Sequence, residues 1–286
     1  MKKRSSVKLI RTAVQIVFFL LVFLVVIGHS LEESGISIPF LKGASLHAIC
    51  PVGGVVTIYQ YITAGTFVQK IHEASFYLMI IVFITAIIAG PIFCGWVCPF
   101  GSFQEWISYI GKKIFPRKYN HMIPKRLDSG LRYLRYGVLL WVLVMTAVSA
   151  KLVFSDFDPY YALFNFWTGE VAITGFIALA LVIFLSLFVE RPFCKYACPY
   201  GALLGITNLF RIFSIRRNPN TCISCGKCDS ACPMNIEVSN KSKIMDHQCI
   251  SCLECTSEAA CPIAATLELN TSQPGKKDGK EVNNEA

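Results

Sequence analysis

Charged side chains are scarce in this chain. Only 16% of its 286 residues are Asp, Glu, Lys or Arg, whereas 54% are hydrophobic. An ordinary soluble domain, in which about a quarter of the residues are charged, is therefore excluded. Basic residues that flank membrane helices explain the formal net charge of +9 better than a nucleic-acid partner does. We expect a membrane protein that lies in the lipid bilayer and binds no nucleic acid.

Three other features are missing from the sequence. The basic start "MKKRSSVKLIR" and the apolar run behind it resemble a secretory signal, but no A-x-A-like cleavage site follows. We therefore expect an uncleaved membrane anchor. The chain has no C-x-x-C-H motif, so we expect no c-type haem. It also contains nothing that resembles a kinase or DNA-binding output domain, which argues against a signalling protein.

Four apolar runs are long enough to cross a bilayer, which takes about 20 residues. They cover residues 12–28, 75–93, 136–154 and 171–189. Lys and Arg are concentrated before the first run, between the second and third, and after the fourth. Because cytoplasmic segments carry the excess of positive charge, both termini should be cytoplasmic. The expected location is the plasma membrane of a prokaryote, with several membrane passes.

One nine-residue pattern, F-C-x-x-x-C-P-aromatic-G, occurs twice, as "FCGWVCPFG" at 93–101 and as "FCKYACPYG" at 193–201. Each copy follows an apolar run and precedes an amphipathic stretch, so the chain contains two units that enter the membrane in the same direction. Cysteines four residues apart share one face of a helix. A pseudo-two-fold axis would then bring both pairs to one point. The candidate ligands are Cys94, Cys98, Cys194 and Cys198.

These four cysteines have three competing interpretations. They are the ligand set of a third iron–sulfur cluster, or they form redox dithiols or a copper(I) site, which soft thiolates suit. In the third interpretation they are inert small residues at closely packed helices, and the Pro and Gly that follow end each helix. Repetition does not decide among them, since a duplication also copies inert residues.

The densest cysteine region begins at residue 222, with "CISCGKCDSACP" followed by "CISCLECTSEAACP". The first run has the C-x2-C-x2-C-x3-C-P spacing of bacterial ferredoxins, in which the fourth cysteine ligates the other cluster. The second has five residues instead of three before its last cysteine, which lengthens a turn without removing a ligand. The predicted ligands are Cys222, Cys225, Cys228 and Cys261 for cluster one, and Cys249, Cys252, Cys255 and Cys232 for cluster two.

Other uses of these eight cysteines are less suitable. Zinc sites also use C-x2-C pairs, but two C-P endings in one short segment favour two [4Fe-4S] clusters. Disulfides are disfavoured on the cytoplasmic side of a membrane.

A second group of candidate ligands belongs to the expected outer half of the protein. It could bind a quinone head group, a haem or a metal, although a lone histidine usually just forms hydrogen bonds. Ionisable residues within a membrane are functional candidates by default. The group consists of His29, His47, Cys50 and His72, with Asp158 as a companion.

Both C-x-x-x-C-P motifs, the four apolar runs and the paired ferredoxin runs resemble a known family across residues 10–268. This is the family of NapH-type membrane polyferredoxins, with related membrane portions in proteins that serve nitrous oxide reductase and cytochrome oxidase copper assembly. The resemblance implies electron transfer between a cytoplasmic donor or quinone pool and a redox partner in or beyond the membrane.

The expected architecture has three parts. Residues 1–214 form an all-α bundle of four transmembrane helices in two parallel two-helix repeats, 215–268 a small α+β bacterial-type two-cluster ferredoxin domain, and 269–286 a disordered tail. The expected function is that of an electron-transfer protein or a subunit of a quinone-linked oxidoreductase. The alternatives are an assembly factor that supplies electrons or copper to a metalloenzyme, and a redox sensor.

The charge asymmetry makes a testable prediction about topology. Reporter fusions after Lys118 and after Ala286 should read cytoplasmic, and one within residues 44–66 should read external, because the external loops hold few Lys and Arg. Paired alkaline phosphatase and fluorescent-protein fusions make the measurement. An external C-terminus would contradict both the topology and the ferredoxin assignment.

Overall fold

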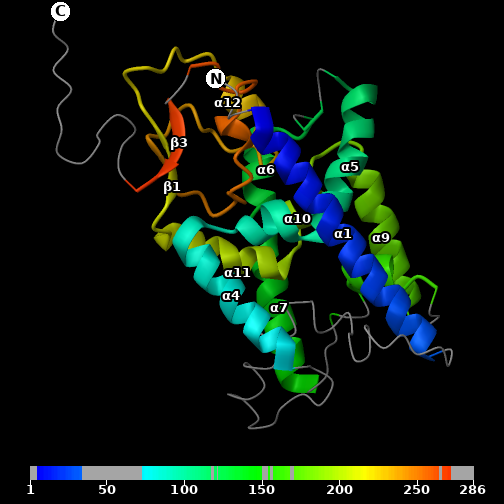
Figure 1. The fold of residues 1–286 in the computed structure, drawn as a ribbon. Helices are drawn as coiled ribbons and strands as arrows, with labels where there is room; N and C mark the ends of the chain where they lie inside the picture. The colour runs from blue at the N-terminus through cyan, green and yellow to red at the C-terminus, as the bar shows by residue number, and fades with distance from the viewer. Residues whose placement is uncertain are drawn as a thin grey trace, which may run out of the picture.

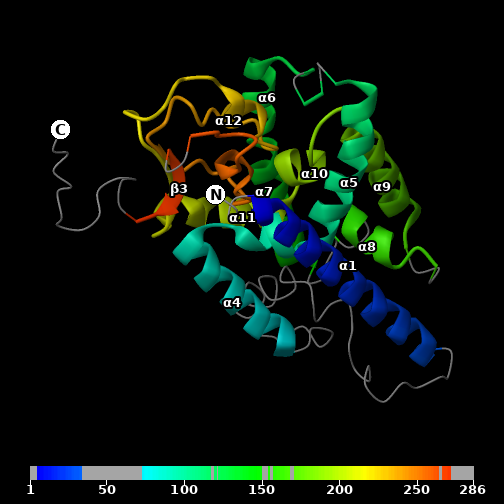
Figure 2. The same cartoon turned by 45° about the horizontal axis from the view of Figure 1, so that its top comes forward.

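The computed structural model describes residues 5–33, 73–116, 119–120, 122–149, 154, 157–167, 171–263 and 266–271. Helices dominate up to residue 210, and a small three-stranded sheet follows near the C-terminus (Figures 1 and 2). In chain order the elements are α1 Ser5–Glu33, α4 Glu73–Ala89, the π-helix η1 Phe93–Val97, α5 Pro99–Ile114, α6 Lys125–Leu131, α7 Leu134–Ser149, α8 Pro159–Phe164, α9 Ile173–Ser186, α10 Pro192–Tyr196, α11 Pro199–Thr207, the 3₁₀ helix η3 Asn208–Phe210, β1 Ser214–Arg217, α12 Lys227–Ser230, β2 Lys243–Ile244, the 3₁₀ helix η4 Glu254–Thr256, and β3 Leu267–Asn270.

The helical part contains the sequence repeat as two sets of helices. The first set is α1, α4, η1 and α5, and the second is α7, α9, α10 and α11. Within each set the first helix packs against the helix that follows the motif, as α1 does with α5 and α7 with α11. Between the sets the partners are exchanged, because α4 packs against α11 and α9 packs against α5. The motif regions therefore meet between the two sets. They lie next to residues 214–271, which we call the ferredoxin region (Figure 1).

The apolar helices differ in length from the predicted spans. In the described part of the chain, only α1 holds an apolar stretch long enough to cross a membrane, Val7–Gly28 with 22 residues. The apolar helices α4, α7 and α9 have 17, 16 and 14 residues. Of the four predicted membrane crossings, this length criterion supports one, and the other three stay predictions.

Two backbone turns explain why α4 and α9 are shorter than the apolar runs. Gly90 follows α4 with a φ of +82°, and Arg191 lies beyond α9 with a φ of +51°. Each residue adopts the left-handed conformation and is followed by a proline, which cannot continue a preceding helix. At Gly90 a side chain would also collide with Ser251, since a Cβ there would lie 2.4 Å from its Oγ. The chain therefore turns sharply just before each cysteine motif.

The C-terminal region forms a three-stranded antiparallel sheet with the order β2-β1-β3. Ile215 in the central strand pairs with Ile244 of β2 and Leu269 of β3. The side chains of Ile215, Ile244 and Met234 are buried in one core with most of the cysteines of the ferredoxin runs. This small α+β unit therefore has its own core, built around the cysteines.

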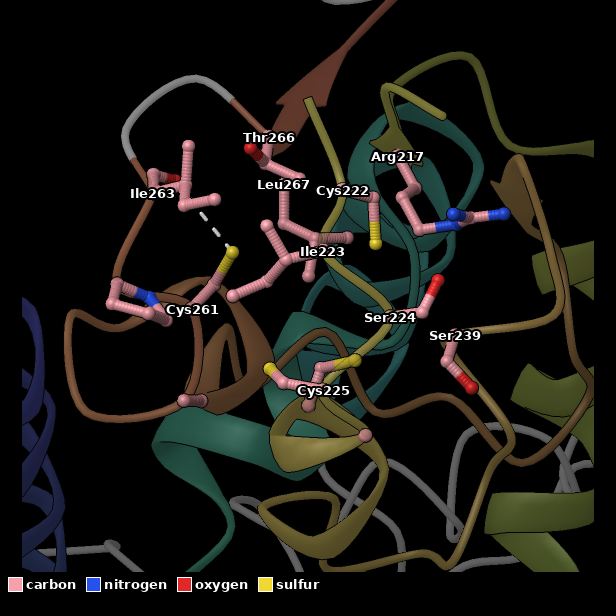
Figure 3. Close-up of a pocket in the computed structure, with 14 residues that line it drawn as sticks. Arg217, Cys222, Ile223, Ser224, Cys225, Ser239, Cys261, Ile263, Thr266 and Leu267 are labelled. Carbon is pink, nitrogen blue, oxygen red and sulfur yellow. Dashed lines mark hydrogen bonds between the residues drawn. The ribbon is translucent and has the colours of Figure 1, made fainter. Parts of the chain in front are cut away.

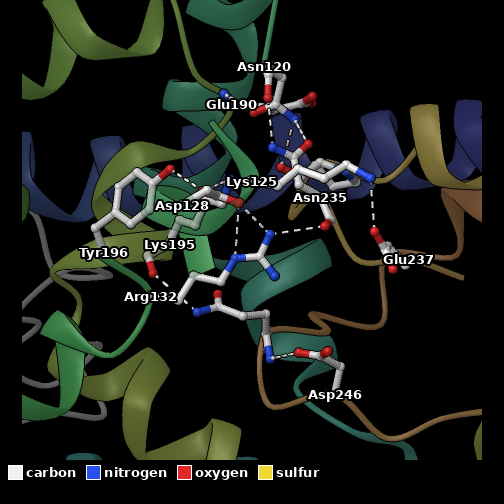
Figure 4. Close-up of polar contacts among 12 residues, drawn as sticks. Asn120, Lys125, Asp128, Arg132, Glu190, Lys195, Tyr196, Asn235, Glu237 and Asp246 are labelled. Atoms are coloured by element: carbon white, nitrogen blue, oxygen red, sulfur yellow. Dashed lines mark hydrogen bonds and ion pairs between the residues drawn. The ribbon is translucent and has the colours of Figure 1, made fainter. Parts of the chain in front are cut away.

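The loop that follows α5 attaches the ferredoxin region to the helices (Figure 4). Asn120 Nδ2 donates to Asn235 Oδ1 at 2.7 Å, and Asn235 Nδ2 donates to the carbonyl oxygen of Asn120 at 2.6 Å. Arg132 donates to the carbonyl oxygen of Asn235 at 2.9 Å. These reciprocal hydrogen bonds fix the ferredoxin region against one end of the bundle.

A network of buried charges joins the parts of the molecule that are far apart in sequence. Glu105 of α5 is buried and accepts hydrogen bonds at 2.5 Å from both Arg11 of α1 and Arg191. Arg11 also donates to Glu254 of the ferredoxin region at 2.6 Å. Burial alone would raise the pKa of Glu105, but the Arg191 and Arg11 guanidinium groups outweigh it and lower that pKa. Glu105 is thus an ionised carboxylate that needs both arginines.

This network predicts a large effect of neutralising Glu105. Glu105→Gln leaves two buried guanidinium groups without their shared counter-charge, so the free energy of unfolding should fall by about 3–5 kcal/mol. Thermal unfolding of the full chain in detergent measures the change as a lower midpoint.

The control is Glu237→Gln, the same change at the exposed ion pair with Lys125. Exposed pairs contribute little because water screens them, so the midpoint should not move. Equal midpoints for the two variants would contradict the assigned role of Glu105.

Candidate iron–sulfur centres

The first candidate centre lies at the edge of the ferredoxin region (Figure 3). One cavity is lined by the four cysteines that the spacing predicts for cluster one, namely Cys222, Cys225, Cys228 and Cys261. Cys225 is exposed and Cys222 is partly exposed. The backbone N–H of Ser224 and the Arg217 side chain lower the pKa of the Cys222 thiol, which favours the thiolate that binds iron.

The longer second run still delivers Cys261 to this cavity. The extra residues form a compact turn, in which the backbone N–H groups of Ala260 and Cys261 donate to the carbonyl oxygen of Ser257 at 3.1 and 2.8 Å. The insertion is thus taken up locally, before the cross-ligand.

The second candidate centre is inside the ferredoxin region. A separate cavity is lined by both apolar side chains and the four cysteines predicted for cluster two. All four are buried, and their neighbours include Ile215, Met234 and Ile244. The set combines one cysteine from the first run with three from the second: Cys232, Cys249, Cys252 and Cys255. Crossed ligation is therefore geometrically available in this fold.

The number of cysteines at each cavity matches the ligand set of a cluster. Each of the two cavities is lined by four cysteines, and a [4Fe-4S] cluster is held by four cysteine thiolates. Among the described residues, no group of three His, Cys, Asp or Glu side chains is arranged to hold a single metal ion.

The cysteines of the repeated motif differ from expectation in their local structure. Cys94 belongs to the π-helix η1, but Cys98 is the N-cap of α5, with ψ at 112°. In the second copy Cys194 lies in α10, and Cys198 is the N-cap of α11. The expectation that each pair shares one face of a single helix is therefore wrong. The reason is Pro99 and its counterpart in the second motif, since proline disfavours helical geometry in the residue before it and starts the next helix well.

The four motif cysteines nevertheless meet. Cys98, Cys194 and Cys198 line one cavity, and Cys94 and Cys198 pack against the same group of buried side chains. Burial and the neighbouring thiolates of Cys194, Cys94 and Cys98 raise the pKa of Cys198. The Gly201 N–H points to Cys198 Sγ at 3.3 Å, and the N–H groups of Gly101 and Phe100 point to Cys98. Such N–H donors stabilise metal-bound thiolates and tune cluster potentials.

Cluster two and the motif cysteines are direct neighbours. A Cβ on Gly95 would lie 2.5 Å from the carbonyl oxygen of Ile250 and 3.3 Å from Cys252 Cα. Trp96 Nε1 donates to the carbonyl oxygen of Ser251 at 3.1 Å, and Cys94 packs against the ferredoxin core. The first motif therefore presses against the cluster-two loop, where only glycine leaves room.

The second motif touches the same region through polar groups. Gln248 Nε2 donates to the carbonyl oxygen of Lys195 at 3.3 Å. Burial alone would lower the pKa of Arg191, but Glu105, Cys194 and Cys252 outweigh it and raise that pKa. The positive charge of Arg191 therefore interacts with both a motif cysteine and a predicted cluster-two cysteine.

Sequence reasoning missed the polar side chains that support this region. Gln104 is fully buried, accepts from the Phe193 N–H at 3.1 Å and points its amide to Cys194 Sγ at 3.5 Å. Glu105 and Gln104 follow the first motif within an otherwise apolar stretch. Two adjacent polar residues in such a stretch indicate that their side chains have buried polar partners. Arg11 looked like one more basic residue of the N-terminal tail, and only its buried contacts reveal its role.

Asp158 lies next to the motif cysteines. The sequence predicts it as a companion of the outer histidines, and in the structure it lines a cavity together with Cys98, Cys194 and Cys198. The short helix α8, which Asp158 caps, packs against α9 and brings this residue to the motifs. His47, Cys50 and His72 lie outside the described residues, as does the side chain of His29.

Comparisons with known proteins agree with this geometry. Residues 71–118 and 171–217 match the family described as a 4Fe-4S binding domain, and residues 214–262 match the 4Fe-4S dicluster domain. No solved structure matches the chain.

Several curated proteins are similar over most of the chain. The putative electron transport protein YccM of Escherichia coli is 29% identical over 78% of this chain and 63% of its own length. An uncharacterized protein of Methanocaldococcus jannaschii, MJ0750, is 32% identical over 70% of this chain and 79% of its own. The ferredoxin-type protein NapH of Haemophilus influenzae is 28% identical over 62% of each chain. The chain thus spans less than two thirds of YccM and NapH.

The fold and the cysteine sites define a 4Fe-4S ferredoxin-type protein, and the function of this class is iron–sulfur electron transfer. The chain belongs to the family of NapH-type 4Fe-4S membrane proteins, which is related to the regulatory protein NosR.

Crossed ligation can be tested by counting iron in single and double variants of the anoxic full chain. Cys249→Ala and Cys222→Ala should each remove one cubane, about four iron atoms. Adding Cys232→Ala to Cys249→Ala should change nothing further, because both residues serve cluster two. Adding Cys232→Ala to Cys222→Ala should remove about four more. The opposite pattern would place Cys232 in cluster one.

Proposed function

We propose that this protein is a membrane electron conduit. It carries electrons between a cytoplasmic donor or the quinone pool and a redox partner in the membrane or beyond it. The observation that supports this most is the direct contact between the cluster-two loop and the first C-x-x-x-C-P motif, at Gly95 and Cys252.

The burial of the cysteines suggests the order of the route. Cluster one has the exposed ligand Cys225, so a soluble partner can approach it. The cluster-two cysteines are buried, and their loop contacts the first motif, where Gly95 lies against Ile250 and Cys252, so we place cluster two next to the motif cysteines. Electrons would thus enter or leave at cluster one and cross to the membrane side through cluster two.

The next redox centre of the proposed route is a third iron–sulfur centre, held by the four motif cysteines. The bilayer core is about 30 Å thick, so a relay inside the protein shortens the step from cluster two. Burial raises the pKa of the Cys94 and Cys194 thiols, and bound iron would supply the charge that stabilises their thiolates.

The proposed topology has four membrane crossings with both termini in the cytoplasm. The charge pattern of the sequence supports it. A second support is the contact of Arg11, near the start of α1, with Glu254 of the ferredoxin region, because it places the N-terminal end of α1 on the ferredoxin side. In this topology the iron–sulfur clusters would be inserted in the cytoplasm, where they are assembled.

The names of the relatives fit this role without fixing the partners. YccM is described as a putative electron transport protein and NapH as ferredoxin-type. A quinone-linked oxidoreductase is therefore the proposed setting. Delivery of electrons or copper to a maturing metalloenzyme is the second candidate, and the soft thiolates of the motifs are the observation that favours it.

The third centre predicts a specific loss of iron. The full chain, purified without oxygen, should hold more than the eight or so iron atoms of two cubanes. Cys94→Ala combined with Cys194→Ala should lower the content to about eight and leave the ferredoxin signals intact. Iron analysis and electron paramagnetic resonance of the reduced protein make the measurement.

Ser102→Ala is the packing control, because Ser102 is buried beside the motif and donates to the carbonyl oxygen of Cys98 at 3.1 Å. It should keep all the iron. A wild-type content of about eight, unchanged in the double variant, would rule out a third centre. Thiol titration and copper analysis of the same samples would then separate a dithiol from a copper site.

A further inference from the structure

The cavity that contains Asp158 has a volume of about 250 Å³. Its wall combines side chains from α1, α4, α5, α8 and the second motif. The lining residues of α1 and α4 lie near the middle of α1 and near the start of α4. It is distinct from the two cavities that the ferredoxin cysteines line.

The wall of this cavity is aromatic and aliphatic. Phe18, Leu78 and Phe100 are among the residues that line it, together with Tyr160 and Tyr200. Ligand sites of this kind hold flat apolar groups, and a few polar atoms set the orientation. A charged or strongly hydrated ligand would lose its water here without compensation.

The cavity can be reached from the lipid phase. Phe18 and Leu21 line it and are also exposed on α1, at 36% and 45%. Leu24 on α1 and Ile81 on α4 continue an apolar surface away from it. Because an apolar helix surface of this kind faces lipid in a membrane protein, the ligand should be lipid-soluble, with its tail along α1 and α4.

Asp158 is the one carboxylate among the described residues that line the cavity. Its Oδ1 accepts a hydrogen bond from the Tyr160 N–H at 3.0 Å, and the Tyr161 N–H also points to it. A carboxylate offers about four lone-pair sites, so it can accept a further hydrogen bond from a hydroxyl group in the cavity. This fixes a polar edge on an otherwise apolar ligand.

The cavity also adjoins the motif cysteines on the side away from the ferredoxin region. Cys98, Cys194 and Cys198 line it, whereas Cys94 packs toward cluster two. The cysteine set therefore has one face toward cluster two and another toward the cavity. A lipid-soluble ligand with a redox-active ring, held next to these cysteines, would be placed to exchange electrons with the centre that they hold.

We propose that this cavity binds the head group of an isoprenoid quinone, with a ring hydroxyl of the reduced form donating a hydrogen bond to Asp158. The proposal rests on the electron-transfer function proposed above and names the membrane-side carrier and its site. The ring lies between the aromatic side chains, and the isoprenoid tail leaves along α1 and α4.

The test is binding of decylubiquinone and decylubiquinol, with menadione as a naphthoquinone arm, to the full chain in detergent under anoxic conditions. Isothermal titration calorimetry gives the affinities. Leu78→Trp fills the cavity and should weaken binding by more than about ten-fold. Ile80→Trp is the matched control, since Ile80 is exposed on the opposite side of the same helix and does not line the cavity. It should bind like the wild type.

Asp158→Asn tests the polar edge. Asn keeps the capping role at the start of α8 and replaces the carboxylate with a neutral amide oxygen, which accepts a weaker hydrogen bond. Binding of decylubiquinol should weaken by about three- to ten-fold, the difference between a charged and a neutral acceptor, with little change for decylubiquinone. Equal affinities for wild type and variant would overturn the role of Asp158.

Two outcomes would overturn the site itself. One is the absence of saturable binding of all three probes to the wild type, and the other is unchanged binding in Leu78→Trp. Equal binding of a plain decyl amphiphile would also count against a quinone and indicate a lipid site. Iron content, measured in every sample, keeps this test separate from the electron-transfer proposal, because a fully loaded protein that binds no quinone refutes only the cavity assignment.

Discussion

The carboxylate of Glu105 is the point on which the arrangement of the molecule depends. It is shared by Arg11 and Arg191, each at 2.5 Å, and Arg11 also reaches Glu254 of the ferredoxin region. Buried charges persist only when they are paired and hydrogen-bonded. One side chain thus ties the start of α1, the helix after the first motif, the turn before the second motif and the ferredoxin region into a single geometry.

The same network matters for the proposed electron route. Iron–sulfur centres gain negative charge on reduction, and nearby cations and N–H donors set their potentials. The positive charge of Arg191 interacts with Cys194 and Cys252, so it acts on both of the proposed neighbouring centres. Its other partner, the carbonyl oxygen of Cys94 at 2.6 Å, fixes the backbone of the first motif at the same time.

The repeat explains why the motif cysteines meet although neither copy forms a site alone. Exchange of partners between the two sets, α4 with α11 and α9 with α5, accompanies the meeting of the two motifs at one cavity. The symmetry between the two sets is incomplete, because the two sides of the cysteine set have different neighbours. One side of the cysteine set contacts the ferredoxin core, and the other borders the cavity that holds Asp158.

The sequence by itself determined the features that depend on short spacing. The C-x2-C runs predict two ligand sets, and two cavities in the structure are lined by these same sets, since the loops that carry them are local. Tertiary structure decided the rest. The left-handed turns at Gly90 and Arg191 end the helices early, and α8 brings Asp158 to the motif cysteines. Glu105 acquires its role only from arginines about 90 residues away on either side. Contacts of this kind depend on how helices pack, and no local pattern of residue types encodes them.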